Sequence, residues 1–359
     1  MTELGQLFIL GISGKKLTEE EGHFLEQENI GGVIFFKHNY ESPAQIAELV
    51  NSIQEKRQED PLFISLDHEG GRVIRFGPPF TQFPAMNKVG LINSPKLTFE
   101  IYQLMAQELK TVGVNLNFAP CCDILHSNTH SAIGDRAFSG DHETVSKHIT
   151  AAIRGLQANG IIACAKHFPG HGLSSKDSHF DLPIIKTSLE QLLEVETRPF
   201  CKASKARVEM IMMAHLIVDA IDERLPTSLS DKAYEFLRKT TKFQKIIVSD
   251  DMEMKAITEH YGIENAPVMC LNAGADLLCY RNFEVGKSAY LAVKKAVKEK
   301  IIPLEKITDK LKRIYLCKKE YLSDYTPIDI PAIQNMIGTL NSKNLMDELN
   351  EKVGLLGAP

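Results

Sequence analysis

The densest group of ionisable side chains in the chain lies between Lys166 and His179. The segment 166–172 reads Lys-His-Phe-Pro-Gly-His-Gly, and Asp177-Ser178-His179 follows it. Because proline and glycine prevent a helix here, we predict a loop on which several of these side chains converge. Imidazole, carboxylate and ammonium groups in one small volume are suited to proton transfer, so a catalytic loop is favoured over an ordinary polar surface loop.

An apolar stretch directly before this loop predicts the strand that positions it. Residues Gly160–Ala165 read as a short buried strand, and they follow an amphipathic helix with Val145, Ile149 and Ile153 on its apolar face. The polar group therefore begins at the C-terminal end of a strand. Open α/β sheets and (β/α)8 barrels place their chemistry at this end.

The same unit of apolar run and helical periodicity recurs along the chain. Eight short runs predict strands: Leu7–Ile12, Gly32–Phe36, Leu62–Leu66, Val114–Ala119, Ile161–Ala165, Val208–Ala214, Ile246–Ser249 and Asp276–Tyr280. Between the second and third runs, Ser42 and Pro43 mark the start of a helix. Eight such repeats favour a closed parallel (β/α)8 barrel of the TIM type over an open sheet.

The chain length fits one barrel with a tail. The 359 residues exceed the ~250 typical of this fold by an amount that loop insertions and an extension can absorb. We predict a catalytic barrel over residues 1–325 and a C-terminal helical extension over residues 326–359 that packs on the barrel and is not a separate domain. Within the extension, residues 332–352 are expected to form a helix on the outside of the barrel or at a subunit contact.

Composition narrows the cellular setting and the partners. With 43% hydrophobic residues the chain can bury a full core, and a net charge of −5 gives no electrostatic reason to expect a nucleic-acid partner. The start Met1-Thr2-Glu3 lacks the basic residues of a signal peptide, so we expect a cytoplasmic protein that does not bind a membrane. The seven cysteines are accordingly expected to be reduced.

Charged groups gather where the predicted strands end. The third strand is followed by Asp67, Glu69, Arg72 and Arg75, the fourth by Asp123 and Arg136, the fifth by Lys166 and His167, the sixth by His215, and the seventh by Asp250 and Asp251. A salt bridge at a barrel mouth explains any one of these groups taken alone. Their accumulation at one rim predicts a functional site there.

Four of these motifs occur together in a known family. They are Asp67 with Glu69-Gly70-Gly71-Arg72, the segment 166–172, Asp177-Ser178-His179, and Ile247-Val248-Ser249-Asp250. In this order, from the first predicted strand to the eighth, they resemble the bacterial β-N-acetylglucosaminidases of glycoside hydrolase family 3. Glucosidases of the family share the Lys-His-Phe and Ser-Asp elements but usually take their acid/base from a second domain. The Asp-Ser-His loop supplies it in the N-acetylglucosaminidase branch.

The resemblance implies a retaining mechanism in which Asp250 attacks the anomeric carbon and forms a covalent glycosyl-enzyme. His179 would then be the acid/base, with Asp177 fixing its tautomer and stabilising the imidazolium. Because neighbours on a strand point to opposite sides, only one of Asp250 and Asp251 is expected to face the barrel mouth. The family pattern selects Asp250, which leaves Asp251 as a helix cap or ion-pair partner. Substrate-assisted catalysis, in which the acetamido oxygen attacks, is the alternative route.

The resemblance also implies which side chains hold the sugar. These are Asp67, Arg75, Arg136, Lys166 and His167, with His215 as a further candidate, while His171 would either bind sugar or pin the loop. Since the chain has no tryptophan, a compact pocket for one terminal residue is favoured over a long polysaccharide cleft.

The implied substrates are small carbohydrates that end in β-linked N-acetylglucosamine, with peptidoglycan-derived anhydromuropeptides as the expected natural example. Neither a cofactor nor a metal ion is expected, and a monomer or weak dimer is compatible with the sequence. A phosphorylase on the same fold remains an alternative, because a histidine acid/base leaves less negative charge near an incoming phosphate. A metal-dependent barrel hydrolase would need His167 and His171 on one helix face, which Pro169 and Gly170 prevent. The presence of both Asp250 and His179 argues against an inactive sugar-binding protein.

Two departures from the family pattern carry structural expectations. Before the seventh predicted strand, relatives commonly have Leu-Gly-Phe-x-Gly where this chain has Thr241-Lys242-Phe243-Gln244-Lys245. The change lies at the strand entrance, opposite the expected active site, so we predict an effect on stability and not on activity. His68 stands where glutamine is usual, and it should point away from the pocket if Asp67 points into it.

Overall fold

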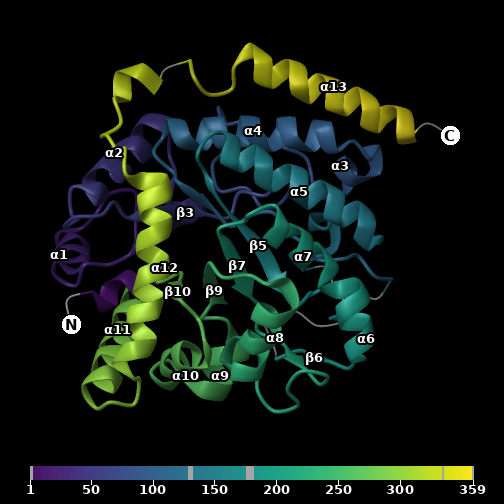
Figure 1. The fold of residues 1–359 in the computed structure, drawn as a ribbon. Helices are drawn as coiled ribbons and strands as arrows, with labels where there is room; N and C mark the ends of the chain where they lie inside the picture. The colour runs from purple at the N-terminus through teal and green to yellow at the C-terminus, as the bar shows by residue number, and fades with distance from the viewer. Residues whose placement is uncertain (1–2, 128–131, 175–181, 334, 358–359) are drawn as a thin grey trace.

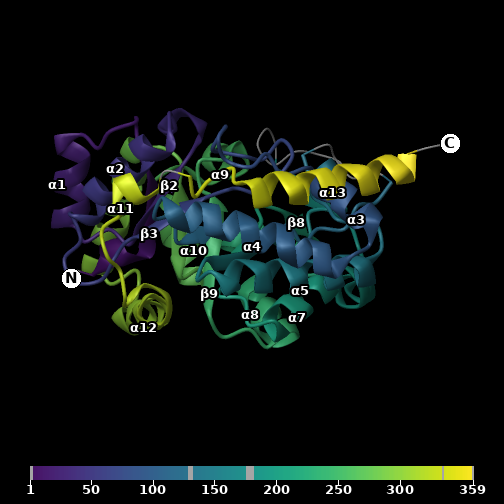
Figure 2. The same cartoon turned by 90° about the horizontal axis from the view of Figure 1, so that it is seen from above.

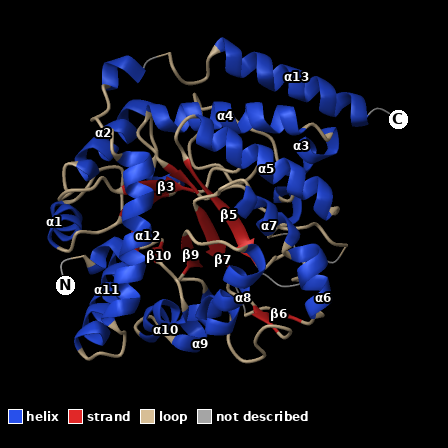
Figure 3. Cartoon of the chain, viewed as in Figure 1, coloured by secondary structure: helices blue, strands red, loops and turns tan. Residues whose placement is uncertain are grey.

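The computed structural model describes residues 3–127, 132–174, 182–333 and 335–357 (Figure 1). Eight parallel strands close into a barrel in the order β1-β10-β9-β7-β5-β4-β3-β2, and helices surround it (Figure 3). The barrel strands are β1 Phe8–Gly11, β2 Gly32–Phe35, β3 Phe63–Leu66, β4 Leu116–Asn117, β5 Ile162–Phe168, β7 Met210–Met213, β9 Ile246–Asp251 and β10 Leu277–Tyr280. Each lies within or overlaps one predicted apolar run, so the predicted (β/α)8 fold is confirmed.

Helices connect successive strands and form the outer ring. They are α1 Glu19–Gln27, α2 Pro43–Gln54, α3 Met86–Ile92, α4 Pro95–Thr111, α5 His142–Ala158, α6 Leu189–Gln191, α7 Arg198–Lys205, α8 Asp231–Thr241, α9 Lys255–Tyr261, α10 Asn265–Ala273, α11 Phe283–Lys298, α12 Leu304–Leu322 and α13 Leu340–Gly357. A small second sheet pairs β6 Ile184–Ile185 with β8 Ile217–Val218. It lies beside the barrel, after the Lys-His-Phe strand β5.

Local side-chain chemistry sets several helix starts. The Ser42 hydroxyl accepts a hydrogen bond from the Gln45 backbone N–H, and Pro43 occupies the first turn, as the sequence predicts. The helix then buries Ile46, Leu49, Val50 and Ile53 against the barrel. Caps of this kind fix where each helix begins, and therefore how long the loop before it can be.

Two strands carry a bulge at the end where they reach the barrel mouth. Between paired positions, β5 advances from Ala165 to Phe168 while β7 advances from Ile211 to Met213. Likewise β9 advances from Val248 to Asp251 while β10 advances only from Leu277 to Cys279. An extra residue in one strand breaks the alternation of side chains between the two faces.

The C-terminal segment differs from the sequence prediction in where its helix begins. A 3-10 turn covers Ile330–Ile333, and α13 starts only at Leu340, so the helix expected over residues 332–352 is displaced toward the C-terminus. Gly338 adopts a positive φ of 63°, a backbone conformation that interrupts a helix. In two perpendicular views α13 runs beside α3 and α4, on the outside of the barrel (Figures 1 and 2).

The apolar core is continuous through the barrel and its helices. All seven cysteines fall within the described residues, and none of them is paired in a disulfide there. Among the described residues, no helix combines the length and the apolar character needed to cross a membrane.

Candidate functional site

A pocket of about 310 Å³ opens at the C-terminal ends of the barrel strands. Its ionisable lining residues are Asp67, Glu69, Arg72, Arg75, Arg136, Lys166, His167, Asp250, Asp251 and Arg281. The structure therefore brings together all five residues predicted to hold sugar and the predicted nucleophile. They come from loops or strand ends at β3, β4, β5 and β9, as expected for the active-site end of a barrel.

A buried ammonium organises the floor of this pocket. Lys166 is 2% exposed, and its Nζ lies 2.7 Å from Asp67 Oδ1 and 2.5 Å from Glu69 Oε1. Arg75 donates to Asp67 Oδ2 over 2.8 Å. Arg136 makes two hydrogen bonds to Glu69, from Nε over 2.9 Å and from Nη2 over 2.8 Å. Three cations thus share two carboxylates, which satisfies the buried charges and fixes the geometry of each side chain.

The charges hold one another in the ionised state. Burial opposes ionisation of Asp67, but Lys166 and Arg75 outweigh it and lower the pKa of this carboxyl. For Glu69, burial is likewise outweighed by Arg136 and Lys166, and its pKa falls to about 2. Burial would lower the pKa of Lys166, yet the two carboxylates raise it. At neutral pH the floor is therefore a fixed array of charges and hydrogen-bonding groups, suited to sugar hydroxyls.

His167 is oriented from the segment that follows β4. Its Nδ1 donates to Asp123 Oδ2 over 2.7 Å, and Arg136 Nη2 lies 3.2 Å from its Nε2. Since a guanidinium can only donate, Nε2 is the acceptor and the ring proton lies on Nδ1. Burial opposes ionisation of Asp123, but His167 lowers the pKa of this carboxyl to about 2. Asp123 was noted at a strand end by sequence, but its role as an orienting group emerges here.

The end of β9 brings two consecutive carboxylates into the pocket. Asp250 Oδ1 accepts the Asp251 backbone N–H over 2.8 Å. Asp251 forms a short ion pair with Arg281, the residue after β10, which confirms the predicted ion-pair role. The expectation that only one of the two aspartates faces the mouth is wrong, because both line the pocket. The bulge in β9 is the physical reason, since the strict alternation of a flat strand does not apply there.

Three other histidines support the surrounding backbone or pack on aromatic rings, and they do not line the pocket. His215 is fully buried; its Nδ1 contacts Ser228 Oγ over 2.7 Å and its Nε2 contacts the Asp251 carbonyl oxygen over 3.1 Å. It supports the end of β9 and is not among the lining residues. The His171 backbone N–H donates to Asp123 Oδ1 over 2.7 Å, which pins the loop. His68 is buried beside Phe76 and Phe83, pointing away from the pocket as predicted.

Two of the three predicted catalytic residues, Asp177 and His179, lie outside the described residues. The prediction for them therefore rests on sequence alone. Other lining residues were not singled out from the sequence, among them Phe36, Met212, Cys279 and Arg281. Arg281 had an available signal: it directly follows the eighth predicted strand, at the rim where the other charges were found.

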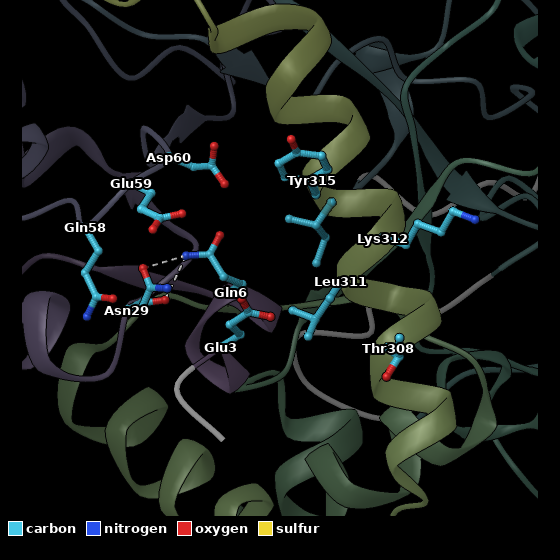
Figure 4. A pocket seen from close by; sticks show the side chains of 11 residues that line it. Glu3, Gln6, Asn29, Gln58, Glu59, Asp60, Thr308, Leu311, Lys312 and Tyr315 are labelled. Carbon is cyan, nitrogen blue, oxygen red and sulfur yellow. Dashed lines mark hydrogen bonds between the residues drawn. The ribbon is translucent and has the colours of Figure 1, made fainter.

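A second cavity, of about 580 Å³, lies at the opposite end of the barrel (Figure 4). Gln6 precedes β1, Asn29 precedes β2 and Asp60 precedes β3, so these residues sit at the N-terminal ends of the strands. Gln6 is already engaged, because its amide donates to Asn29 and its carbonyl oxygen accepts from Lys318. Although this cavity is larger, the five predicted sugar-binding residues, the predicted nucleophile Asp250 and the ion pairs around Lys166 lie in the smaller one, which we take as the candidate active site.

Within the described residues, one cluster could in principle offer three ligand atoms to a metal ion. Its members are Cys121, Asp123 and His167, whose ligand atoms lie within 4.8 Å of one another. Of the residues in the metal-hydrolase alternative, only His167 belongs to it. Cys121 Sγ and His167 Nδ1 already donate to Asp123 Oδ2, over 3.2 and 2.7 Å, and Arg136 lies against His167. Hydrogen bonds thus account for the cluster, and the neighbouring guanidinium disfavours a cation.

Comparison with known proteins gives a consistent family. Residues 1–316 match the glycosyl hydrolase family 3 N terminal domain. A β-hexosaminidase of Nitrosomonas eutropha is 38% identical over 286 residues, covering 78% of this chain and 81% of that protein. A β-hexosaminidase of Methylobacillus flagellatus is 35% identical over 280 residues, covering 76% of this chain and 79% of that protein.

Solved structures agree with this result. A family 3 β-N-acetylglucosaminidase from Paenibacillus superposes with a TM-score of 0.91 at 32% identity, over 98% of this chain and 68% of that one. NagZ from Neisseria gonorrhoeae, in complex with N-trifluoroacetyl-D-glucosamine, gives 0.79 at 27% identity, over 97% and 98% of the two chains. The chain therefore belongs to glycoside hydrolase family 3 and is a glycoside hydrolase with β-N-acetylhexosaminidase activity.

Proposed function

We propose that this enzyme is a retaining exo-β-N-acetylglucosaminidase that removes terminal N-acetylglucosamine from peptidoglycan-derived anhydromuropeptides. The observation that carries the proposal is the position of Asp250 in the same small pocket as Asp67, Lys166 and Arg136. A pocket of about 310 Å³ suits one sugar residue better than a polymer. That NagZ of Neisseria gonorrhoeae binds an N-acylglucosamine supports the choice of sugar.

Asp250 is the proposed nucleophile. The Asp251 N–H holds its Oδ1, which limits rotation of the carboxylate and keeps it aimed from the end of β9. One carboxylate oxygen bonds to the anomeric carbon as the bond to the leaving oxygen breaks, and the transition state resembles an oxocarbenium ion. The product of this step is a glycosyl ester on Asp250.

His179, oriented by Asp177, is the proposed acid/base. It would give a proton to the leaving oxygen in the first step and remove one from water in the second, so that water releases the sugar with retained configuration. The floor charges would bind the sugar hydroxyls in both steps. Asp67 accepts hydrogen bonds, while Arg75, Arg136 and Lys166 donate them.

Mass spectrometry of a trapped intermediate tests the nucleophile. A fluorinated N-acetylglucosaminide that slows release of the glycosyl-enzyme should label the peptide that contains Asp250, and Asp250→Asn should not be labelled. If an oxazoline product appears and no peptide is labelled, the acetamido group is the nucleophile and our assignment is wrong. Running the reaction in phosphate buffer separates hydrolysis, which yields free sugar, from the phosphorylase alternative, which yields the sugar 1-phosphate.

The natural substrate and the location need separate tests. We propose a cytoplasmic enzyme acting on an anhydromuropeptide, and kcat/KM for N-acetylglucosaminyl-anhydromuropeptide should exceed that for chitobiose. The opposite order would favour chitin fragments as the substrate class.

Dialysis against a chelator should leave the activity intact, since the mechanism assigns no step to a metal ion.

A further inference from the structure

A buried glutamate ties the C-terminal segment to the loop that carries half of the pocket floor. Glu108 on α4 is 1% exposed. It accepts hydrogen bonds from Thr81 N over 2.8 Å, Thr81 Oγ1 over 2.7 Å, Gly338 N over 2.9 Å and Ser342 Oγ over 3.2 Å. One carboxylate thus joins three parts of the chain that are far apart in sequence.

The loop it holds is residues 67–85, here called the binding loop. This loop follows β3 and carries Asp67, Glu69, Arg72 and Arg75, all of which line the pocket. The Gly71 backbone N–H donates to the Phe83 carbonyl oxygen over 2.8 Å, so the two ends of the loop are joined. Displacement near Thr81 is therefore transmitted to the segment that carries the floor residues.

Aromatic packing makes the binding loop behave as a unit. The rings of Phe76 and Phe80 lie 5.0 Å apart, and Tyr40 stacks on Phe76 at 5.1 Å. Phe76 also contacts His68, whose Nδ1 accepts from the Arg75 backbone N–H over 3.4 Å. The path from Thr81 to Arg75 consequently runs through packed rings and a backbone hydrogen bond.

The C-terminal residues 326–333 and 335–342, here called the strap, are fixed at two places. Asn51 on α2 exchanges two hydrogen bonds with the Ile328 backbone, over 2.9 and 2.8 Å. Further along, Gly338 lies so close to the binding loop that a Cβ there would be 2.4 Å from the Pro79 carbonyl oxygen. Its backbone approaches the loop closely, and its N–H reaches Glu108.

We propose that Glu108 is a positioning residue for substrate recognition, and that it acts by clamping the strap onto the binding loop so that Asp67 and Arg75 stand where the sugar needs them. The strap lies beyond the residues that match the family domain, which end at residue 316. The family match therefore does not include this contact. The inference rests on the position of the candidate active site and does not depend on the identity of the aglycone.

Glu108→Gln is the central variant, because it preserves the volume of the side chain. The carboxylate only accepts hydrogen bonds, whereas the amide turns an N–H group toward the donors of Thr81 or Gly338. A loop that is correctly placed only a fraction of the time raises KM by the inverse of that fraction and leaves kcat nearly unchanged. We expect KM for p-nitrophenyl N-acetyl-β-glucosaminide to rise about tenfold, with kcat within about twofold of wild type. The thermal shift produced by added N-acetylglucosamine should shrink in parallel, which reports binding without turnover.

Glu209→Gln is the matched control. Glu209 is 2% exposed, precedes β7 at the opposite end of the barrel, and binds Tyr321 of α12 and Gln157. This variant should lower Tm as Glu108→Gln does, but leave KM unchanged. An unchanged KM in Glu108→Gln, alongside a fall in Tm like that of the control, would overturn the proposal and leave Glu108 with a purely structural role.

Thr81→Val provides a milder perturbation in case Glu108→Gln does not fold. It keeps the backbone N–H bond to Glu108 and removes only the hydroxyl, so KM should rise about threefold with kcat unchanged. A Thr81→Val enzyme with wild-type KM would also count against the clamp. Absence of any activity in the wild-type enzyme would instead contradict the enzymatic assignment, so the two failures are distinguishable.

Discussion

His167 Nδ1 donates a hydrogen bond to Asp123 Oδ2 over 2.7 Å, which joins the end of β5 to the segment after β4. Because Asp123 Oδ1 also accepts the His171 backbone N–H, one carboxylate fixes both the ring and the loop beyond it. The imidazole therefore presents Nε2 to the pocket in a single tautomer. This arrangement makes Asp123 a test of how much the orientation of His167 contributes.

Asp123→Asn should lower kcat/KM by about 10- to 100-fold, because an amide no longer stabilises the Nδ1 tautomer and Nε2–H would then face Arg136. Steady-state kinetics on a chromogenic N-acetylglucosaminide checks this, with circular dichroism confirming the fold. Cys121→Ser, which keeps a donor to Asp123, is the control and should change little. Wild-type kinetics in the asparagine variant would show that the orientation of His167 is unimportant.

Lys166→Met should destabilise the protein by about 3 to 5 kcal/mol, because it leaves the buried Glu69 and the partly buried Asp67 with too little positive charge. Urea denaturation measures the change. Adding Glu69→Gln to the same chain removes one of the stranded charges, so the double variant should be more stable than Lys166→Met alone. If the loss of unfolding free energy in the double variant equals the sum of the losses in the two single variants, the two groups are energetically independent.

Glu253, which follows β9, should make stability depend on pH near neutrality. Burial raises the pKa of this carboxyl to about 7, and Asp251 adds to the rise. The folded state prefers the protonated acid, so the favourable contribution is present below pH ~4.3, the unfolded pKa, and is lost as pH rises toward 7. As pH rises across this interval, the Tm of Glu253→Gln should therefore increase relative to the Tm of wild type. The exposed Glu299→Gln should show no such trend, and parallel curves for wild type and Glu253→Gln would contradict the assignment.

His179→Ala should separate substrates by their leaving groups. Activated aryl glycosides need little protonation and should lose far less activity than alkyl glycosides or disaccharides, whose poor leaving groups need an acid. Rates across a series of leaving groups of different pKa give the comparison. Equal losses for all substrates would mean that another group is the acid.

Lys242→Gly should stabilise the enzyme without changing its kinetics. Lys242 ends α8 with a φ of 57°, the left-handed conformation that glycine adopts without strain. Relief of the left-handed strain is worth about 1 to 2 kcal/mol. The greater freedom of glycine in the unfolded chain offsets part of it, which leaves an expected gain of about 0.5 to 1 kcal/mol. Lys239→Gly, inside the same helix, should lose about 1 kcal/mol instead. A loss at position 242 would mean that the lysine side chain makes a compensating contact.

Much of this architecture could be predicted from local pattern. Apolar runs of strand length, helix caps such as Ser42, and charges placed directly after the runs are local properties, and the closed barrel with its polar rim follows from them. The five sugar-binding candidates and Asp250 were found this way, together with the family resemblance, and the structure places them in one pocket.

The remaining features depend on contacts between distant segments. The bulges that turn both Lys166 and His167, and both Asp250 and Asp251, into the pocket depend on how β5 and β9 pair with their neighbours. The hydrogen bonds of Glu108 join residues more than two hundred positions apart. Strand register and long-range burial are properties of the packed chain, because their energies arise between segments that no sequence window contains. Periodicity therefore fixed which residues reach the rim, while packing set their orientation there.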